Sequence, residues 1–98
     1  MTSAVVLRRA ARQEFDEAAL WYEGRRAGLG SQFTAEVERV IRLVAETPER
    51  FPPMHRDVRC VRVRRFPYSV FFRIETTRIV VLAVFHARRN SAIWQRRV

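Results

Sequence analysis

The stretch of sequence that decides the fold lies at residues 62–89 and reads RVRRFPYSVFFRIETTRIVVLAVFHARR. Its second half holds an almost wholly apolar run, residues 79–85, which is typical of a central strand buried on both faces. The polar segment before that run, residues 75–78, is expected to form a hairpin turn. Further upstream, alternate residues are apolar and predict a strand with one buried face, namely Tyr68, Val70, Phe72 and Ile74.

Two more strands are expected outside this hairpin. Residues 57–66 alternate, so that valines at 61 and 63 face one way while Arg62 and Arg64 face the other. Pro67 separates this strand from the next one. Residues 4–8 read as a short first strand, and residues 51–53, Phe-Pro-Pro, are expected to be an irregular loop.

Two helices are predicted between the first strand and that loop. The first spans residues 9–26, and the second spans residues 31–46, with Ser31 as its N-cap and Pro48 after its end. All three glycines lie where the chain must reverse between the helices. Each helix has one apolar stripe, formed by Ala11, Phe15, Ala18, Ala19 and Tyr22 in the first and by Phe33, Val37, Val40, Ile41 and Val44 in the second.

The predicted fold class is therefore α+β, with an N-terminal strand and a two-helix hairpin packed on a twisted antiparallel β-sheet. Residues 1–98 are expected to form a single domain, because no linker, repeat or low-complexity tract interrupts the pattern. Trp21, Tyr22 and Phe33 are expected to pack the helix hairpin. The tail, residues 90–98, reads as either a short helix or a loose segment.

The charge of the chain points to an anionic partner. The formal net charge is +9, and all 19 basic residues are arginines. Arginine makes planar, bidentate contacts with phosphate and carboxylate groups, so nucleic acid and acidic proteins are the partner classes that this surface suggests.

Several classes of protein are excluded by what the chain lacks. Cys60 is the only cysteine, so an intrachain disulfide and a cysteine-based metal site are impossible. We expect no metal and no cofactor. The N-terminal apolar run is too short for a signal peptide, and residues 79–85 are too few to cross a bilayer, so a cytoplasmic protein without membrane contact is expected.

Several fragments, in order, resemble the RelE/ParE superfamily of bacterial type II toxins. The resemblance covers nearly the whole chain, and it implies a toxin that a cognate antitoxin holds silent, with operator DNA contacted only indirectly through that antitoxin. The fragments are WYE at 21–23, GLG at 28–30 with Phe33 after it, TPERFP at 47–52, RRFPYSVFF at 64–72, VLAVFHARR at 81–89, Trp94 and Arg97.

Two mechanisms divide that superfamily, and a shared fold does not choose between them. RelE-like members are ribosome-dependent endoribonucleases that cut mRNA, whereas ParE-like members inhibit DNA gyrase without nuclease activity. RNA cleavage needs a proton acceptor, a proton donor and cations around the phosphate. The resemblance to the ribonucleases implies that Arg62, Arg64 and Arg88 are the cations around the phosphate.

The chain departs from the ribonuclease pattern at two positions. Ser69 stands where an arginine is expected, although a shift of one residue brings Arg65 or Arg73 into play. Trp94 stands where a tyrosine is expected, and indole does not exchange a proton usefully near neutral pH. These losses favour the ParE-like function, in which the C-terminal basic residues Arg65, Arg88 and Arg89 and the exposed side of the helix hairpin contact gyrase.

His86 keeps the ribonuclease alternative open. It follows the buried run at 79–85, and histidine is the side chain suited to acid–base chemistry near neutral pH. If the chain is a ribonuclease, His86 is the candidate catalytic residue and the ribosome and mRNA are the partners. In either case the candidate target- or phosphate-binding residues are Arg62, Arg64, Arg65, Arg88 and Arg89.

Overall fold

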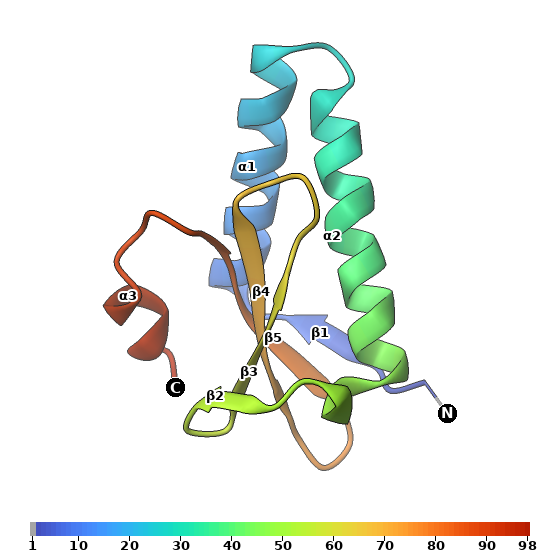
Figure 1. Ribbon diagram of the computed structural model, residues 1–98, viewed down its shortest axis with the longest axis vertical. Helices are drawn as coiled ribbons and strands as arrows, with labels where there is room; N and C mark the ends of the chain where they lie inside the picture. The colour runs from blue at the N-terminus through green and yellow to red at the C-terminus, as the bar shows by residue number, and fades with distance from the viewer. Residues whose placement is uncertain (1) are drawn as a thin grey trace.

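The computed structural model describes residues 2–98 and shows an α+β fold in which a helix hairpin packs on a five-stranded sheet (Figure 1). This confirms the predicted fold class. In chain order the elements are β1 (Val5–Leu7), α1 (Arg9–Arg25), α2 (Leu29–Glu46), the 3-10 helix η1 (Pro48–Arg50), β2 (Pro53–His55), β3 (Val58–Arg62), β4 (Tyr68–Ile74), β5 (Ile79–His86) and α3 (Ala92–Gln95).

The sheet has the strand order β1-β5-β4-β3-β2. Strands β2 to β5 pair antiparallel with their neighbours, as expected. β1, for which no pairing was predicted, pairs parallel with β5, with Val5 opposite Ile79 and Leu7 opposite Val81, so the five-stranded sheet as a whole is mixed. β4 occupies one edge of β5, and the apolar β1 pairs along the other.

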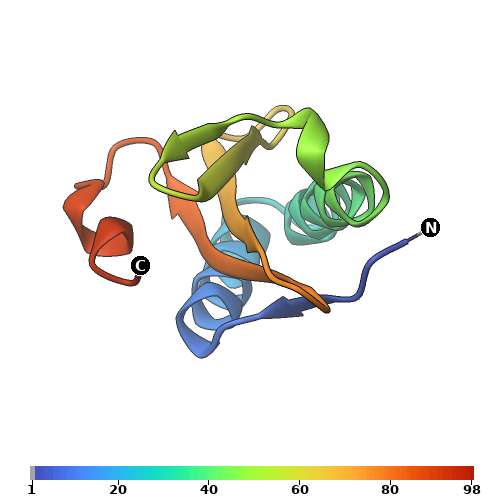
Figure 2. The ribbon, with the colours of Figure 1, turned by 90° about the horizontal axis from the view of Figure 1, so that it is seen from below.

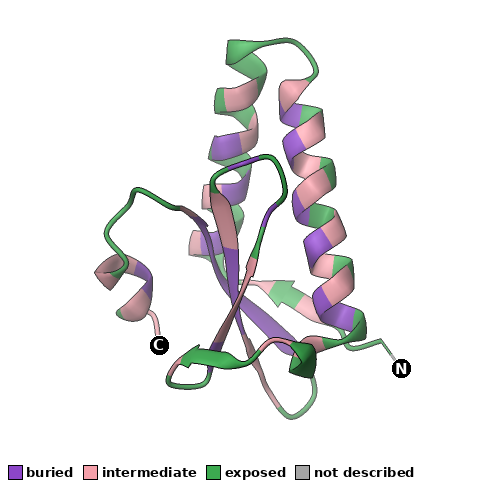
Figure 3. Cartoon of the chain, viewed as in Figure 1, coloured by how far each residue is buried: buried purple, intermediate pink, exposed green. Residues whose placement is uncertain are grey.

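β5 is the centre of the molecule and is buried on both faces, as predicted. On one face it packs with the helix hairpin, and the apolar stripes of α1 and α2 lie in the same cluster as the alternating residues of β4. On the other face a smaller cluster forms around Trp94 of α3. Figure 2 shows α2 and α3 on opposite sides of the sheet, and Figure 3 shows β5 buried along nearly its whole length.

A β-bulge in β5 decides which side chains face the helices. Phe71 of β4 lies opposite Ala83 and Phe72 lies opposite Val81, so Leu82 has no partner across the strands. Leu82 and Ala83 therefore both face α3, and the alternation changes phase after them. As a result Val84 packs on the helix side, which an unbroken alternation from Ile79 would not have produced.

The helix hairpin differs from prediction at its turn. α2 begins at Leu29, with Gly28 as N-cap in the left-handed region at φ 88°, so the expected N-cap role of Ser31 is wrong. The carboxylate of Glu23 instead accepts hydrogen bonds from the N–H groups of Gly28, at 2.9 Å, and Gly30, at 3.0 Å. A long acidic side chain from α1 thus caps α2, because the short turn brings it within reach.

The strands before β4 also differ in extent. β3 ends at Arg62, so the expected strand over 57–66 is too long. Residues 63–67 form a turn in which the N–H of Val63 donates to the carbonyl of Tyr68 at 2.9 Å, and Arg65 is left-handed at φ 71°. Residues 51 and 52 are irregular, as expected, whereas Pro53 begins strand β2, which pairs with β3. The tail contains a short helix, α3, which is the first of the two alternatives.

No helix in residues 2–98 combines the length and apolar character that crossing a membrane requires.

Candidate functional site

An aromatic cleft lies beside the end of β5. It comprises two adjoining hollows of about 340 Å³ and 400 Å³ that share Trp21, Tyr68 and His86 in their walls. Trp21 was expected to pack the hairpin, but 58% of its surface is exposed, so that expectation is wrong. Trp21 precedes Tyr22 by one residue and so lies about 100° around the helix from it, off the apolar stripe of α1. Tyr22 and Phe33 pack as predicted, with ring centroids 5.1 Å apart.

His86 is the last residue of β5 and lies opposite Tyr68. Their rings meet edge to face, with centroids 5.1 Å apart. Nδ1 of His86 accepts a hydrogen bond from the N–H of Arg88 at 3.0 Å, which leaves only Nε2 to exchange a proton. Burial is the main cause that raises the pKa of Tyr68, so this phenol stays protonated at neutral pH.

The cleft beside His86 is poorly suited to a phosphodiester. Its walls include Glu14 and Glu17 against one arginine, Arg89. That arginine already forms an ion pair, because its Nη1 lies 2.7 Å from Oε2 of Glu14. An RNA backbone entering this cleft would therefore meet two carboxylates without a free cation to offset them.

The structure separates His86 from Arg62. Arg62 lies opposite Ser69, and Ser69 lies opposite Phe85, so these three residues share one face of the sheet. Phe85 belongs to the cluster around α3, whereas the neighbouring Tyr68 packs with the helix hairpin. His86, opposite Tyr68, is thus on the helix side, and Arg62 is on the opposite face.

The remaining predicted arginines occupy the turns at this end of the sheet. Arg64 and Arg65 lie in the turn after β3, where Nη2 of Arg65 donates to Oε1 of Gln32 at 2.8 Å. Arg88 is exposed in the turn after β5. Because the N–H of Ala87 donates to the carbonyl of Pro67 at 2.8 Å, the two turns are neighbours.

Glu14 is the residue that sequence reasoning missed. Only 11% of its side chain is exposed, and it binds both Arg89 and Arg97. Arg97 meets it with two nitrogens at 3.0 Å, and Arg89 also lies over the ring of Phe85, 4.4 Å from its centroid. The signal was present, because a carboxylate lies on the apolar stripe of α1, four residues before Ala18.

Trp94 has a packing role. It is 2% exposed and stacks on Phe71 at a centroid distance of 4.2 Å. Its ring also meets that of His55 edge to face at 5.4 Å. The residue that stands where a ribonuclease tyrosine was expected is thus part of the core that holds α3 on the sheet.

Comparison with known proteins defines the class to which this fold belongs. A family model described as the ParE toxin of the type II toxin–antitoxin system, parDE, matches residues 5–91. The chain belongs to the ParE toxin family, since this match covers most of its length.

A solved structure shares the fold. A chain from the chromosomal ParDE toxin–antitoxin system of P. aeruginosa superposes with a TM-score of 0.78, covering 89% of this chain and 98% of that chain. The two sequences are 15% identical, so the likeness concerns the fold. No curated protein matches the sequence of this chain.

Proposed function

We propose that this chain is the toxin of a type II toxin–antitoxin pair that stops growth by inhibiting DNA gyrase without catalysis of its own. Membership of the ParE toxin family supports the toxin role. The observation that favours gyrase over mRNA is the placement of His86 and Arg62 on opposite faces of the sheet. RNA cleavage needs its proton-transfer group and its phosphate-binding cations around one bond.

A cognate antitoxin is the second partner in this proposal. The aromatic cleft and the exposed side chains beside it, Leu20 at 73% and Trp21 at 58%, offer apolar anchors for an amphipathic segment of such a protein. Both partners place the chain in the cytoplasm, which agrees with its single unpaired cysteine.

The test of the target is pulse labelling after the chain is induced alone in cells. Thymidine incorporation is expected to fall before methionine incorporation, and the purified chain is expected to inhibit supercoiling by gyrase. If methionine incorporation falls first while DNA synthesis continues, the ribosome and mRNA are the target and the gyrase proposal is wrong.

His86→Ala separates the two mechanisms in the same cells. A gyrase inhibitor is expected to keep its growth arrest, whereas a nuclease that uses His86 for proton transfer would lose activity by about a hundredfold or more. His55→Ala is the matched control, because it removes the other histidine of the chain. Loss of toxicity in His86→Ala alone, with folding intact, would favour the ribonuclease.

A further inference from the structure

The net charge of the protein resides in one half of the chain. Residues 1–50 contain eight arginines and eight carboxylates, whereas residues 51–98 contain eleven arginines and only two carboxylates, Asp57 and Glu75. Both of these carboxylates are already paired, Asp57 with Arg73 at 3.2 Å and Glu75 with Arg78 at 3.0 Å. The whole excess of +9 therefore lies on the strands, their turns and the C-terminal segment.

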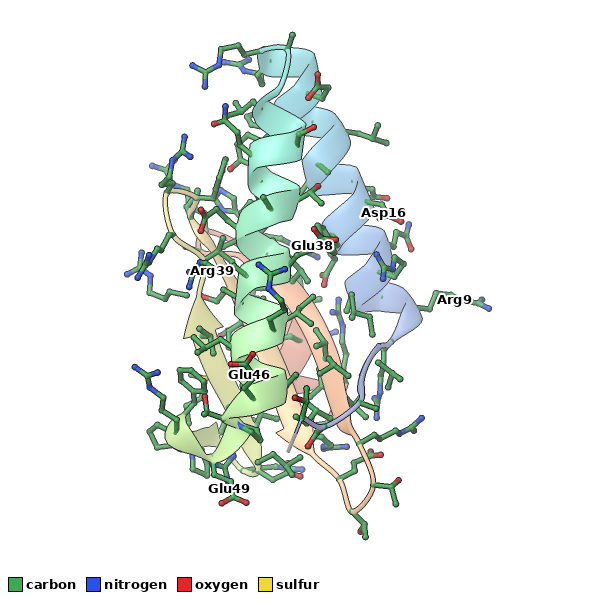
Figure 4. The ribbon with its side chains drawn as sticks, turned by 90° about the vertical axis from the view of Figure 1, so that its right-hand side faces the viewer. Arg9, Asp16, Glu38, Arg39, Glu46 and Glu49 are labelled. Atoms are coloured by element: carbon green, nitrogen blue, oxygen red, sulfur yellow. The ribbon has the colours of Figure 1, made fainter. Side chains whose placement is uncertain are left out.

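The helix hairpin shows the contrast. In Figure 4, where α2 faces the viewer, Asp16, Glu38, Glu46 and Glu49 are spread among arginines. Several of these charges cancel locally, such as Arg12 with Asp16 at 3.8 Å, four residues apart on α1. A surface of mixed charge like this one attracts no extended anion.

Four arginines gather at one end of the sheet, and we call them the arginine rim: Arg62, Arg64, Arg65 and Arg88. Arg62 ends β3, the next two lie in the turn after it, and Arg88 follows β5. Strand β4 alone separates β3 from β5, and adjacent strands lie about 4.8 Å apart, so the two strands that lead into the rim lie about 10 Å apart.

The rim has no counter-charge of its own. Within residues 2–98, no carboxylate lies within ion-pair distance of its four side chains. Arg65 makes only neutral contacts, a hydrogen bond to Gln32 and a position over the ring of Phe66, 5.9 Å from its centroid. Glu36, one helical turn from Gln32, forms an ion pair with Arg39, whose Nε lies 3.1 Å from its Oε1. Arg89 does not count toward the rim, because Glu14 neutralises it.

The rim lacks what a protein partner would need. Protein interfaces depend on exposed apolar anchors surrounded by polar groups. The exposed large apolar side chains among the described residues are Val6, Leu20, Trp21 and Met54, and none of them belongs to the two turns. Trp21 lines the aromatic cleft next to the rim, together with Pro67 and His86, and that cleft is the site offered to the antitoxin. The rim itself thus presents guanidinium groups without an apolar anchor among them, and such groups suit a polymer of phosphates.

The rim also lacks what a single strand would need. Proteins that bind single-stranded nucleic acid stack its bases on exposed aromatic rings. Here Phe66 is 7% exposed, and Phe85 is 4% exposed beneath the guanidinium of Arg89. Phosphate contacts alone remain, and these suit duplex DNA, whose bases are already stacked and whose charges are regularly spaced.

We propose that the arginine rim binds the phosphate backbone of duplex DNA directly. The rim lies on two turns and the end of β3, and its contacts are to phosphates, so we expect the binding to be independent of base sequence. This inference goes beyond the proposed function and does not rest on it, because the contact needs neither gyrase nor an antitoxin.

The test is fluorescence anisotropy of the purified chain with a labelled duplex of random sequence at 50–200 mM salt. With four phosphate contacts, the logarithm of the affinity is expected to fall with the logarithm of the salt concentration at a slope of about −3.6. The affinity then drops about a hundredfold over that range. No binding to the duplex at 50 mM salt would overturn the proposal.

Two triple variants with the same loss of charge locate the contact. Arg62→Gln, Arg64→Gln and Arg88→Gln together are expected to bring the slope to about −1. The control combines Arg9→Gln, Arg26→Gln and Arg42→Gln, three exposed arginines of the helix hairpin, and is expected to keep most of the slope. Circular dichroism confirms that both variants remain folded.

Each remaining outcome counts against the proposal. Equal losses in the two triple variants would mean that only overall charge matters. Tighter binding of single-stranded RNA of equal length would assign the rim to RNA. Displacement of the duplex by polyglutamate at equal charge would assign the rim to an acidic protein instead.

Discussion

At the residue scale, the side chains of Glu14 and Arg97 form hydrogen bonds with the backbone of β5 where no neighbouring strand does so. β1 ends at Leu7, opposite Val81, so the edge of β5 beyond that point has no strand beside it. There the N–H of Val84 donates to Oε1 of Glu14 at 3.1 Å, and the carbonyl of Leu82 accepts from Nη1 of Arg97 at 3.1 Å. One carboxylate and one guanidinium thus satisfy the backbone groups next to the bulge.

Glu14→Ala is expected to lower the free energy of unfolding by about 2 kcal/mol or more. The substitution leaves the N–H of Val84 without its acceptor and Arg97 without its ion pair, and charged hydrogen bonds contribute about 1.5–3 kcal/mol. Urea denaturation measures the loss. Glu17→Ala, an exposed carboxylate one turn along α1, is the control and is expected to stay within about 0.5 kcal/mol of the wild type. Similar losses in both variants would contradict the role of Glu14.

Because of Cys60, the free energy of unfolding is expected to fall as the pH becomes alkaline. Burial raises the pKa of its thiol, although its hydrogen bond with Ser69 and the charge of Arg62 act in the opposite direction. Because the folded state holds this proton more tightly, the stabilisation is complete below the pKa of an unfolded thiol, about 8.5, and is lost as the pH rises through the folded value.

The expected result is a stability difference between the wild type and Cys60→Ala that is constant near pH 7 and shrinks from about pH 8.5 upward. Urea denaturation at a series of pH values measures it. Using the difference between the two proteins removes the contributions of Tyr22 and Tyr68, whose pKa values are also raised by burial. A difference that stays constant to pH 10 would show that the thiol is as solvated in the folded state as in the unfolded one.

At the element scale, the helix hairpin depends on how closely its two helices approach at the turn. A Cβ on Gly30 would lie 2.5 Å from the carbonyl oxygen of Ala19, a backbone atom that cannot move without displacing α1. Gly24 is different, since a Cβ there would meet nothing within 4 Å. The two glycines therefore serve different purposes although they are close in sequence.

The two alanine substitutions are expected to change stability in opposite directions. Gly30→Ala is expected to cost about 1–3 kcal/mol, because the helices must separate to admit the methyl group. Gly24→Ala, inside α1, is expected to stabilise by about 0.5–1 kcal/mol, because alanine has the higher helix propensity. Thermal denaturation of the two variants measures both effects. Equal shifts of the melting temperature would mean that helix propensity alone decides the outcome.

At the scale of the whole molecule, the sheet is covered by the helix hairpin on one face and by α3 on part of the other. The second cover is small, and Trp94, the buried residue of α3, stacks on Phe71. The C-terminal segment is also tied to α1 by the ion pair between Arg97 and Glu14. Packing of Trp94 and the polar contacts of Arg97 thus both hold the end of the chain in place.

Trp94→Ala is expected to cost about 3–5 kcal/mol, since a buried tryptophan leaves a large cavity. Trp21→Ala, which removes the exposed tryptophan, is the matched control and is expected to stay within about 0.5 kcal/mol of the wild type. Urea denaturation followed by circular dichroism compares the two. A loss confined to the control would mean that the cleft, rather than α3, stabilises the fold.

Regular hydrophobic periodicity was enough to predict much of the fold. The apolar run of β5 and the stripes of α1 and α2 are local patterns, because a helix or strand with one buried face must repeat its apolar residues at a fixed spacing. The fold class, the two helices and the alternation of β4 followed from these patterns. The arginines at the rim also followed, since residues that flank a buried strand must lie at its ends.

The features that sequence could not supply depend on contacts between distant segments. The pairing of β1 with β5 depends on which edge of β5 is free, and the exposure of Trp21 depends on which side of α1 the sheet covers. The bulge at Leu82 shifts the alternation by one residue, and it thereby places His86 on the face away from Arg62. Composition and periodicity thus determined the elements and the charge of this protein. Only the tertiary structure decided which side chains meet, because a shift of one residue in a strand moves every later side chain to the other face.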